Sequence, residues 1–292
     1  MIDFSNIIIK TMKIEMYDGP LKEKLDKCFE MPTDRAVIED TFVHGANFEN
    51  WYEKCQSFEM KSSDVWVVTY PKAGTTWTQE MVWCILNDLE SEEAQIELME
   101  RVPFIEKTQI MGLKKLLRSK LYFQIIYVCR DPRDVCVSYY YHHLKLMAYS
   151  GNFDEFFDLF INDVLIFSPF WKHILEFWER RHDDNIFFIR FEDMKQNLRG
   201  MIKKVAKFLG KELSEEYIDK LENHLSFENM KTNAAVNNES TFSAIECRKD
   251  IRFMRNGKVG DWKCHLNESQ VKQINKWIED NLKDSDFPYY RT

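Results

Sequence analysis

The segment from Val65 to Ile85 restricts the possible folds of this chain more than any other stretch. It begins with an apolar, strand-like run and passes through a short loop into residues whose apolar side chains recur at helical spacing. The segment therefore predicts a strand, a tight loop and a helix, which is the arrangement of an anion-binding site. The apolar residues with helical spacing are Trp77, Met81, Cys84 and Ile85.

The loop of this segment has the features of a phosphate-binding site. Backbone N–H groups in a first helical turn have no partners within the helix, and the helix dipole adds partial positive charge there. Gly74 to Trp77 would supply these groups, and Lys72 adds a full charge. The loop is not a Walker A sequence, because its lysine precedes its glycine. Taken alone, it is consistent with either an anion site or an ordinary connection with one exposed lysine.

Two further apolar runs, Gln124–Cys129 and Ile186–Arg190, predict strands that lie beside the first. Strands that alternate with helices form a parallel sheet, and ligands bind at the C-terminal ends of its strands. Lys72 and Arg130 both lie at such ends. We therefore expect a single-domain α/β fold, a parallel β-sheet flanked by helices, with a P-loop-like binding loop.

The residues after Arg130 predict a helix that carries polar side chains toward the same end of the sheet. Asp131, Pro132 and Asp134 mark a turn into this helix, which is expected to run through Val135–His143. On this helix Ser138 lies one turn before His142. The two residues therefore share a face.

Cations cluster near the C-terminus of an otherwise acidic chain. Between Arg248 and Lys263 six cations face two aspartates, and Gly257 and Gly260 would let the backbone approach an anionic ligand closely. A solvated basic loop is the other interpretation, because charge-rich segments commonly form solvated surface. We expect such a surface for the acidic stretch Asp88–Glu100.

Composition limits the organisation, location and partners of the chain. With 292 residues and no internal repeat, we expect one domain over 1–292, with 1–63 as an N-terminal extension packed on it. The net charge of -8 argues against nucleic-acid binding. Seven cysteines without a CxxC pair suit a reduced compartment, and there is neither an export signal nor a membrane-spanning apolar run. We expect a cytoplasmic protein that contacts no membrane.

Four motifs together resemble the cytosolic sulfotransferase family. They are YPKAGTTW, RDPRDVCVSYY, FEDMKQN and FMRNGKVGDWK, in the family's order and at roughly its spacing. That family transfers a sulfuryl group from 3'-phosphoadenosine 5'-phosphosulfate (PAPS) to a hydroxyl or amine. The resemblance implies PAPS as donor, a small apolar acceptor such as a phenol, alcohol or steroid, and no metal. It leaves a homodimer open, because the family's dimer motif is not recognisable after Lys263.

The resemblance also implies roles for individual residues. Lys72 would stabilise the leaving phosphate, and the loop through Trp77 would hold the 5'-phosphosulfate. Arg130 and Ser138 would bind the 3'-phosphate with help from the last loop. The donor-binding set implied in full is Lys72, Ala73, Gly74, Thr75, Thr76, Trp77, Arg130, Ser138, Phe191, Ser226, Phe227, Met230, Phe253, Met254, Arg255, Asn256 and Gly257.

Three donor-site positions differ from the family pattern. Phe191 stands where the family has tyrosine, Leu225 where it has threonine, and Asn256 where it has lysine. The rings of Trp77 and Phe227 can still enclose an adenine. The resemblance therefore implies a nearly complete donor site.

The family's catalytic base has no direct counterpart in this sequence. In the family, the histidine of a Lys-Thr-His-Leu-Pro motif takes the acceptor's proton, and this chain lacks that motif. By distance from Arg130, the counterpart is Lys107-Thr108-Gln109-Ile110, which places Gln109 at the base position. Alternatively, the chain omits this strand altogether. His142 or His143 is the other candidate for the base.

Three functions follow from these alternatives. The first is a PAPS-dependent sulfotransferase. The second is a nucleotide-binding pseudoenzyme or truncated isoform that binds the donor product without transferring a group. The third is a P-loop kinase, which would bind ATP in a magnesium-dependent manner.

Overall fold

A computed structural model of the chain describes residues 14–29, 35–38, 41–44, 61–104 and 123–291. At its centre lies a parallel sheet of β4 (Val65–Thr69), β5 (Gln124–Cys129) and β6 (Ile186–Arg190), in the spatial order β4-β5-β6. Val67 pairs with Ile126, which also pairs with Phe187. The three predicted strands are confirmed, and helices connect them as parallel pairing requires.

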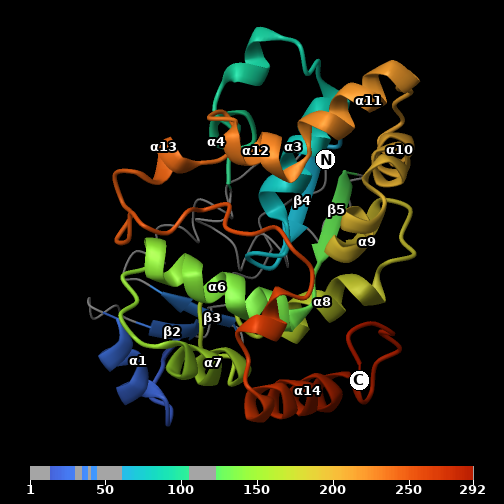
Figure 1. The fold of residues 1–292 in the computed structure, drawn as a ribbon. Coiled ribbons are helices and arrows are strands. Elements are labelled where there is room, and N and C mark those ends of the chain that lie inside the picture. Colours follow the sequence, from blue (N-terminus) through green and yellow to red (C-terminus); the bar gives the residue numbers. More distant parts are fainter. Residues whose placement is uncertain (1–13, 30–34, 39–40, 45–60, 105–122, 292) are drawn as a thin grey trace, which may run out of the picture.

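Helices cover both faces of this sheet (Figure 1). The side chains of β5 alternate between two cores: Ile125, Tyr127 and Cys129 are buried in one, and Ile126 and Val128 in the other. The first core includes side chains of α6 (Pro132–Leu146), α7 (Phe153–Ile161), α8 (Phe170–Glu179) and α14 (Glu268–Leu282). The second includes side chains of α3 (Thr75–Leu86), α9 (Phe191–Gln196), α10 (Leu198–Phe208) and α11 (Glu215–His224).

The helix expected after Arg130 is present, and α6 begins at Pro132, within the residues that the sequence assigns to the turn before it. Pro132 occupies the first turn, and the side chain of Asp131 accepts a hydrogen bond from the backbone N–H of Arg133 at 2.9 Å. The first N–H groups of a helix have no partner within the helix. Pro132 has no N–H at this point, and the carboxylate of Asp131 accepts a hydrogen bond from the next N–H group, that of Arg133. The helix therefore starts directly after Arg130, at the end of β5.

The described N-terminal elements contact α7 and the segment before it. Phe29 forms a β-bridge with Tyr149, and the ammonium of Lys27 binds the carboxylate of Glu155 at 2.9 Å. Within the described ranges, no helix combines the length and apolarity needed to cross a membrane. The other elements are β1 (Ile14–Met16), α1 (Lys22–Cys28), β2 (Arg35–Ile38), β3 (Thr41–His44), η2 (Glu92–Gln95), α4 (Leu98–Arg101), α12 (Phe227–Thr232), α13 (Glu239–Phe242) and η4 (Asp261–Cys264).

The acidic stretch Asp88–Glu100 lies mostly on the surface, as predicted, but two of its apolar residues face inward. The side chains of Ala94 and Leu98 are buried, and the backbone N–H of Leu98 donates to the carbonyl of Ala235 at 2.7 Å. Two apolar residues among many acids are enough to anchor the segment to the second core. Its next residue, Met99, reaches the cavity described below.

Candidate active site

The loop between β4 and α3 lies at the C-terminal edge of the sheet and lines a cavity. Helix α3 begins at Thr75, and Gly74 precedes it in a left-handed conformation with φ of 117°; among the described residues, no side chain caps the helix. The first-turn N–H groups are therefore available to a ligand. Lys72 also has a positive φ, of 67°, which is uncommon for a residue with a Cβ.

Space as well as backbone conformation requires glycine at position 74. A Cβ on Gly74 would lie 2.9 Å from the ring of Phe191. Phe191 meets Trp77 edge to face, with 5.5 Å between ring centroids, and the guanidinium of Arg130 lies 4.3 Å from its ring centroid. Residues from three predicted donor-binding motifs are thus in contact.

Arg130 connects the two loops that the sequence associates with anion binding. Its guanidinium donates to the carbonyl oxygens of Lys72 and Lys258, both at 3.1 Å. The side chain is 10% exposed, and its Nε has no hydrogen-bond partner among the described residues. Because an unpaired buried donor is costly, an acceptor atom of a bound ligand would be stabilised here.

Asp134 of α6 holds the C-terminal loop beside the cavity. Its buried carboxylate accepts hydrogen bonds from the backbone N–H groups of Gly260 at 2.7 Å and Trp262 at 3.0 Å. In Figure 1 the segment between α13 and α14 runs along α6. Gly257 in this loop has φ of 63°, and a Cβ there would lie 2.3 Å from the ring of Phe227. The close approach of the loop to Phe227 therefore requires glycine.

These elements enclose a cavity of about 520 Å³. Most residues predicted to bind the donor line it, together with His142. Ala73 is buried and Ser226 caps α12, and neither is among the lining residues, while Gln109 lies outside the described residues. The predicted donor residues that line the cavity are Lys72, Gly74, Thr75, Thr76, Trp77, Arg130, Ser138, Phe191, Phe227, Met230, Phe253, Met254, Arg255, Asn256 and Gly257.

Sequence reasoning missed the apolar half of the cavity. Its residues are of the types found in any core, and they come from separate segments without a shared motif. Only tertiary structure distinguishes them from core residues. Lys195 and Lys258 were also missed, although Lys258 belongs to the basic segment near the C-terminus. The apolar residues concerned are Met99, Phe104, Leu146, Met147, Phe167, Phe242 and Ile245.

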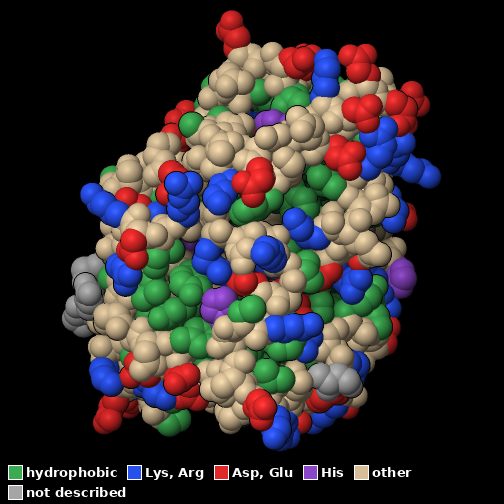
Figure 2. Space-filling view, viewed as in Figure 1, with side chains coloured by type: hydrophobic (Ala, Val, Ile, Leu, Met, Phe, Trp, Pro, Cys, Tyr) green, Lys and Arg blue, Asp and Glu red, His purple; other side chains and the backbone are tan. Residues whose placement is uncertain are grey.

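Positive charge is concentrated around Lys72 in the cavity lining. Burial, together with the charges of Arg130 and Arg255, lowers the pKa of Lys72 to about 7. In Figure 2, Lys and Arg side chains gather across the middle of the visible face, whereas Asp and Glu lie mainly toward its top and bottom. An anionic ligand fits this part of the lining, because it would favour the protonated form of Lys72 and supply an acceptor for Arg130.

Outside the cavity, Glu80, Cys84 and His224 lie close enough together to hold a metal ion, with their ligand atoms within 4.8 Å of one another. The sequence does not reveal this group, because His224 lies on α11, far along the chain from α3. The carboxylate of Glu80 already binds Arg101 at 2.8 Å and Nε2 of His224 at 2.6 Å. Because an arginine beside the carboxylate disfavours a cation, we interpret the group as a buried network that joins α3, α4 and α11.

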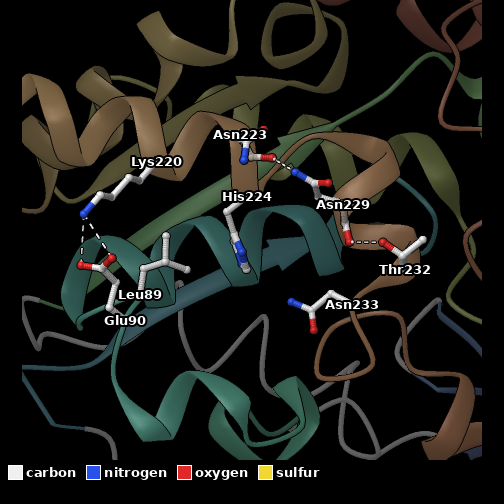
Figure 3. A pocket seen from close by; sticks show the side chains of 8 residues that line it. All are labelled: Leu89, Glu90, Lys220, Asn223, His224, Asn229, Thr232 and Asn233. Atoms are coloured by element: carbon white, nitrogen blue, oxygen red, sulfur yellow. Dashed lines mark hydrogen bonds and ion pairs between the residues drawn. The ribbon is translucent and has the colours of Figure 1, made fainter.

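A small polar hollow lies next to His224 (Figure 3). Lys220 and Glu90 form an ion pair across one side at 3.1 Å, and the side-chain amide of Asn229 donates to the carbonyl of Asn223 at 2.7 Å. These polar groups already bond to one another. The larger cavity at the sheet edge, which has unpaired donors and an apolar wall, is the better candidate for a ligand site.

Comparison with known protein sequences finds relatives over most of the chain. The family model described as "Sulfotransferase domain" matches residues 62–286. The luciferin sulfotransferase of Photinus pyralis is 33% identical, over 83% of this chain and 78% of that protein. Sulfotransferase 1C2 of Homo sapiens is also 33% identical, over 82% of this chain and 89% of that protein.

A solved structure shares the architecture across nearly the whole chain. It is a retinol dehydratase in complex with androsterone and the inactive cofactor PAP, with a TM-score of 0.83 and 28% sequence identity. The match covers 96% of this chain and 98% of the retinol dehydratase. A mouse sulfotransferase complexed with PAP, 22% identical and with a TM-score of 0.62, has a similar fold.

Proposed function

The chain belongs to the sulfotransferase family, and from that premise we propose that it transfers a sulfuryl group from PAPS to a hydroxyl or amine of a small apolar acceptor. One observation carries the proposal: a cluster of cations and an uncapped helix N-terminus share a single cavity with an apolar wall. Charged donor and apolar acceptor can therefore meet in one enclosed space, as group transfer requires.

For the donor, we assign the 5'-phosphosulfate to Lys72 and the N-terminus of α3. PAPS supplies an activated sulfuryl group, and the chain supplies positive charge where the leaving phosphate gains negative charge. Arg130, Ser138 and the loop Arg255–Gly257 would bind the 3'-phosphate. The unpaired Nε of Arg130 supports this assignment.

For the acceptor, we assign the apolar half of the cavity. Its aromatic and methionine side chains suit a phenol, an alcohol or a steroid, because they offer a large apolar surface with few polar groups. The related retinol dehydratase has been solved with androsterone and with retinol. Both ligands belong to this chemical range, which supports the assignment.

Transfer of label from [³⁵S]PAPS to a phenol and to a hydroxysteroid tests this function. We expect labelled product with at least one acceptor. Tight binding of the desulfonated nucleotide PAP with no turnover, in both the wild type and Gln109→His, would instead identify a nucleotide-binding pseudoenzyme. Magnesium-dependent ATP binding would identify a P-loop kinase.

A further inference from the structure

Transfer to a hydroxyl requires a group that accepts the hydroxyl proton, and the described cavity offers few such groups. Its lining cations cannot serve while they are protonated. The carboxylate of Asp261 accepts hydrogen bonds from the side chains of Arg255 and Asn256. Lys72 would be held in its protonated form by the donor's negative charge. His142 is the lining residue that remains.

His142 packs against the same aromatic ring as the lysine assigned to the leaving group. Its ring centroid lies 6.2 Å from that of Phe253, and the ammonium of Lys72 lies 4.0 Å from the centroid of the same Phe253 ring. Both side chains line the cavity. Both side chains thus pack against the Phe253 ring, and the charge of Lys72 acts on the imidazole and lowers its pKa.

The ring of His142 is not committed to another residue. Its Nδ1 has no hydrogen-bond partner in the described part of the chain, and the ring packs on that of Tyr139, with 5.9 Å between centroids. The neighbouring His143 also packs on Tyr139, with 4.2 Å between ring centroids, but its environment is different. It is fully buried away from the cavity, and its Nδ1 bonds the carbonyl oxygen of Tyr139 at 2.9 Å. The geometry therefore distinguishes two histidines that the sequence could not.

The surroundings of His142 also favour the form that accepts a proton. Burial lowers the pKa of His142 well below its ordinary value, and the charges of Lys72 and His143 lower it further. The imidazole is therefore neutral at pH 7. Tyr139 is the other titratable group packed against it from α6, and Phe253 from the C-terminal loop carries no charge.

We propose that His142 is the general base of the transfer reaction, an inference that rests on the proposed function. A ring nitrogen of His142 takes the acceptor's hydroxyl proton as the acceptor oxygen forms its bond to sulfur. The bond between sulfur and the 5'-phosphate oxygen breaks, and its electron pair stays on the phosphate beside Lys72. The proton then leaves His142 for solvent after the products depart.

The test compares the wild type with His142→Gln on acceptors of graded acidity, from an aliphatic alcohol through phenol to nitrophenols. Loss of a positioned base typically lowers the rate about 10²–10⁴-fold. We expect kcat/KM to fall in this range for the alcohol and much less for the nitrophenols, because acidic hydroxyls ionise without a base. Added imidazole should partly restore His142→Ala.

Affinity for PAP, measured by calorimetry, reports whether each variant is folded, since His142 is not assigned to the donor site. His182→Gln, at an exposed position, is the matched control and should behave as the wild type. If His142→Gln lowered kcat/KM equally for all acceptors, or did not lower it at all, the role of His142 would be overturned while the transferase function remained intact. No turnover by the wild type with any acceptor would overturn both.

Discussion

At the scale of single residues, Lys72 carries the most unusual combination of properties in the described site. Its backbone is left-handed, which costs energy for a residue with a Cβ, and its ammonium is buried beside two arginines. A bound anion would offset the repulsion between these positive charges, so such an unfavourable combination is typical of a ligand-binding site. Lys72 therefore links donor binding to protonation.

Donor binding should take up protons at mildly alkaline pH. In the free protein the pKa of Lys72 is about 7, so at pH 8 its amine is mostly neutral. A bound nucleotide anion raises that pKa and favours the ammonium. Because of Lys72, the affinity for PAP should fall as the pH rises above 7. Calorimetry at pH 8 in buffers of different ionisation enthalpy measures the uptake, which Lys72→Met should abolish.

Arg130→Ala should remove most of the protein's preference for a nucleotide that carries a 3'-phosphate over one that lacks it. Hydrogen bonds to charged groups contribute about 1.5–3 kcal/mol each, so the affinity for PAP should fall roughly 10–100-fold. Affinity for the same nucleotide without a 3'-phosphate should change far less. Paired binding titrations of the two nucleotides measure this. An unchanged ratio of the two affinities would contradict the assignment of Arg130.

At the scale of elements, α6 organises both sides of the cavity. It presents Ser138 and His142 to the ligand space, while Asp134 on an earlier turn binds the backbone of the C-terminal loop. A helix is well suited to this, because residues three or four positions apart share a face. The position of the loop that carries Gly257 therefore depends on a residue that lies outside the cavity lining.

Asp134→Ala should weaken donor binding, although Asp134 is not among the residues that line the cavity. The variant leaves the N–H groups of Gly260 and Trp262 without their acceptor, so the loop should become more mobile. We expect roughly tenfold weaker binding of PAP and faster hydrogen exchange at these two amides. The exposed aspartate variant Asp184→Ala is the control. Unchanged exchange at both amides would show that Asp134 does not hold the loop.

At the scale of the whole molecule, some buried interactions support stability without lining the cavity. The pair Glu80–Arg101 is almost fully buried in the second core, with side chains 0% and 3% exposed, and His224 completes it. By contrast, the pair Glu90–Lys220 lies on the surface nearby. The two pairs allow a matched comparison of buried and exposed ion pairs.

Glu80→Ala should lower the free energy of unfolding by about 3–5 kcal/mol, because it leaves a buried arginine unpaired. Glu90→Ala should change it by no more than about 1 kcal/mol. Denaturant titration of both variants measures the difference. Where Glu80→Ala remains folded, its affinity for PAP should match that of the wild type, and a similar loss of stability in both variants would contradict this account.

The sequence alone determined the three parallel strands, the loop before α3, the helix after β5 and the clustering of cations in the chain. These features rest on local signals: apolar periodicity, a helix cap, and glycines among cations within a few residues of one another. Tertiary structure alone decided the apolar half of the cavity, the separate environments of His142 and His143, and the contact of Glu80 with His224. Those properties depend on which distant segments pack together, and burial and hydrogen bonding between such segments leave no local pattern in the chain.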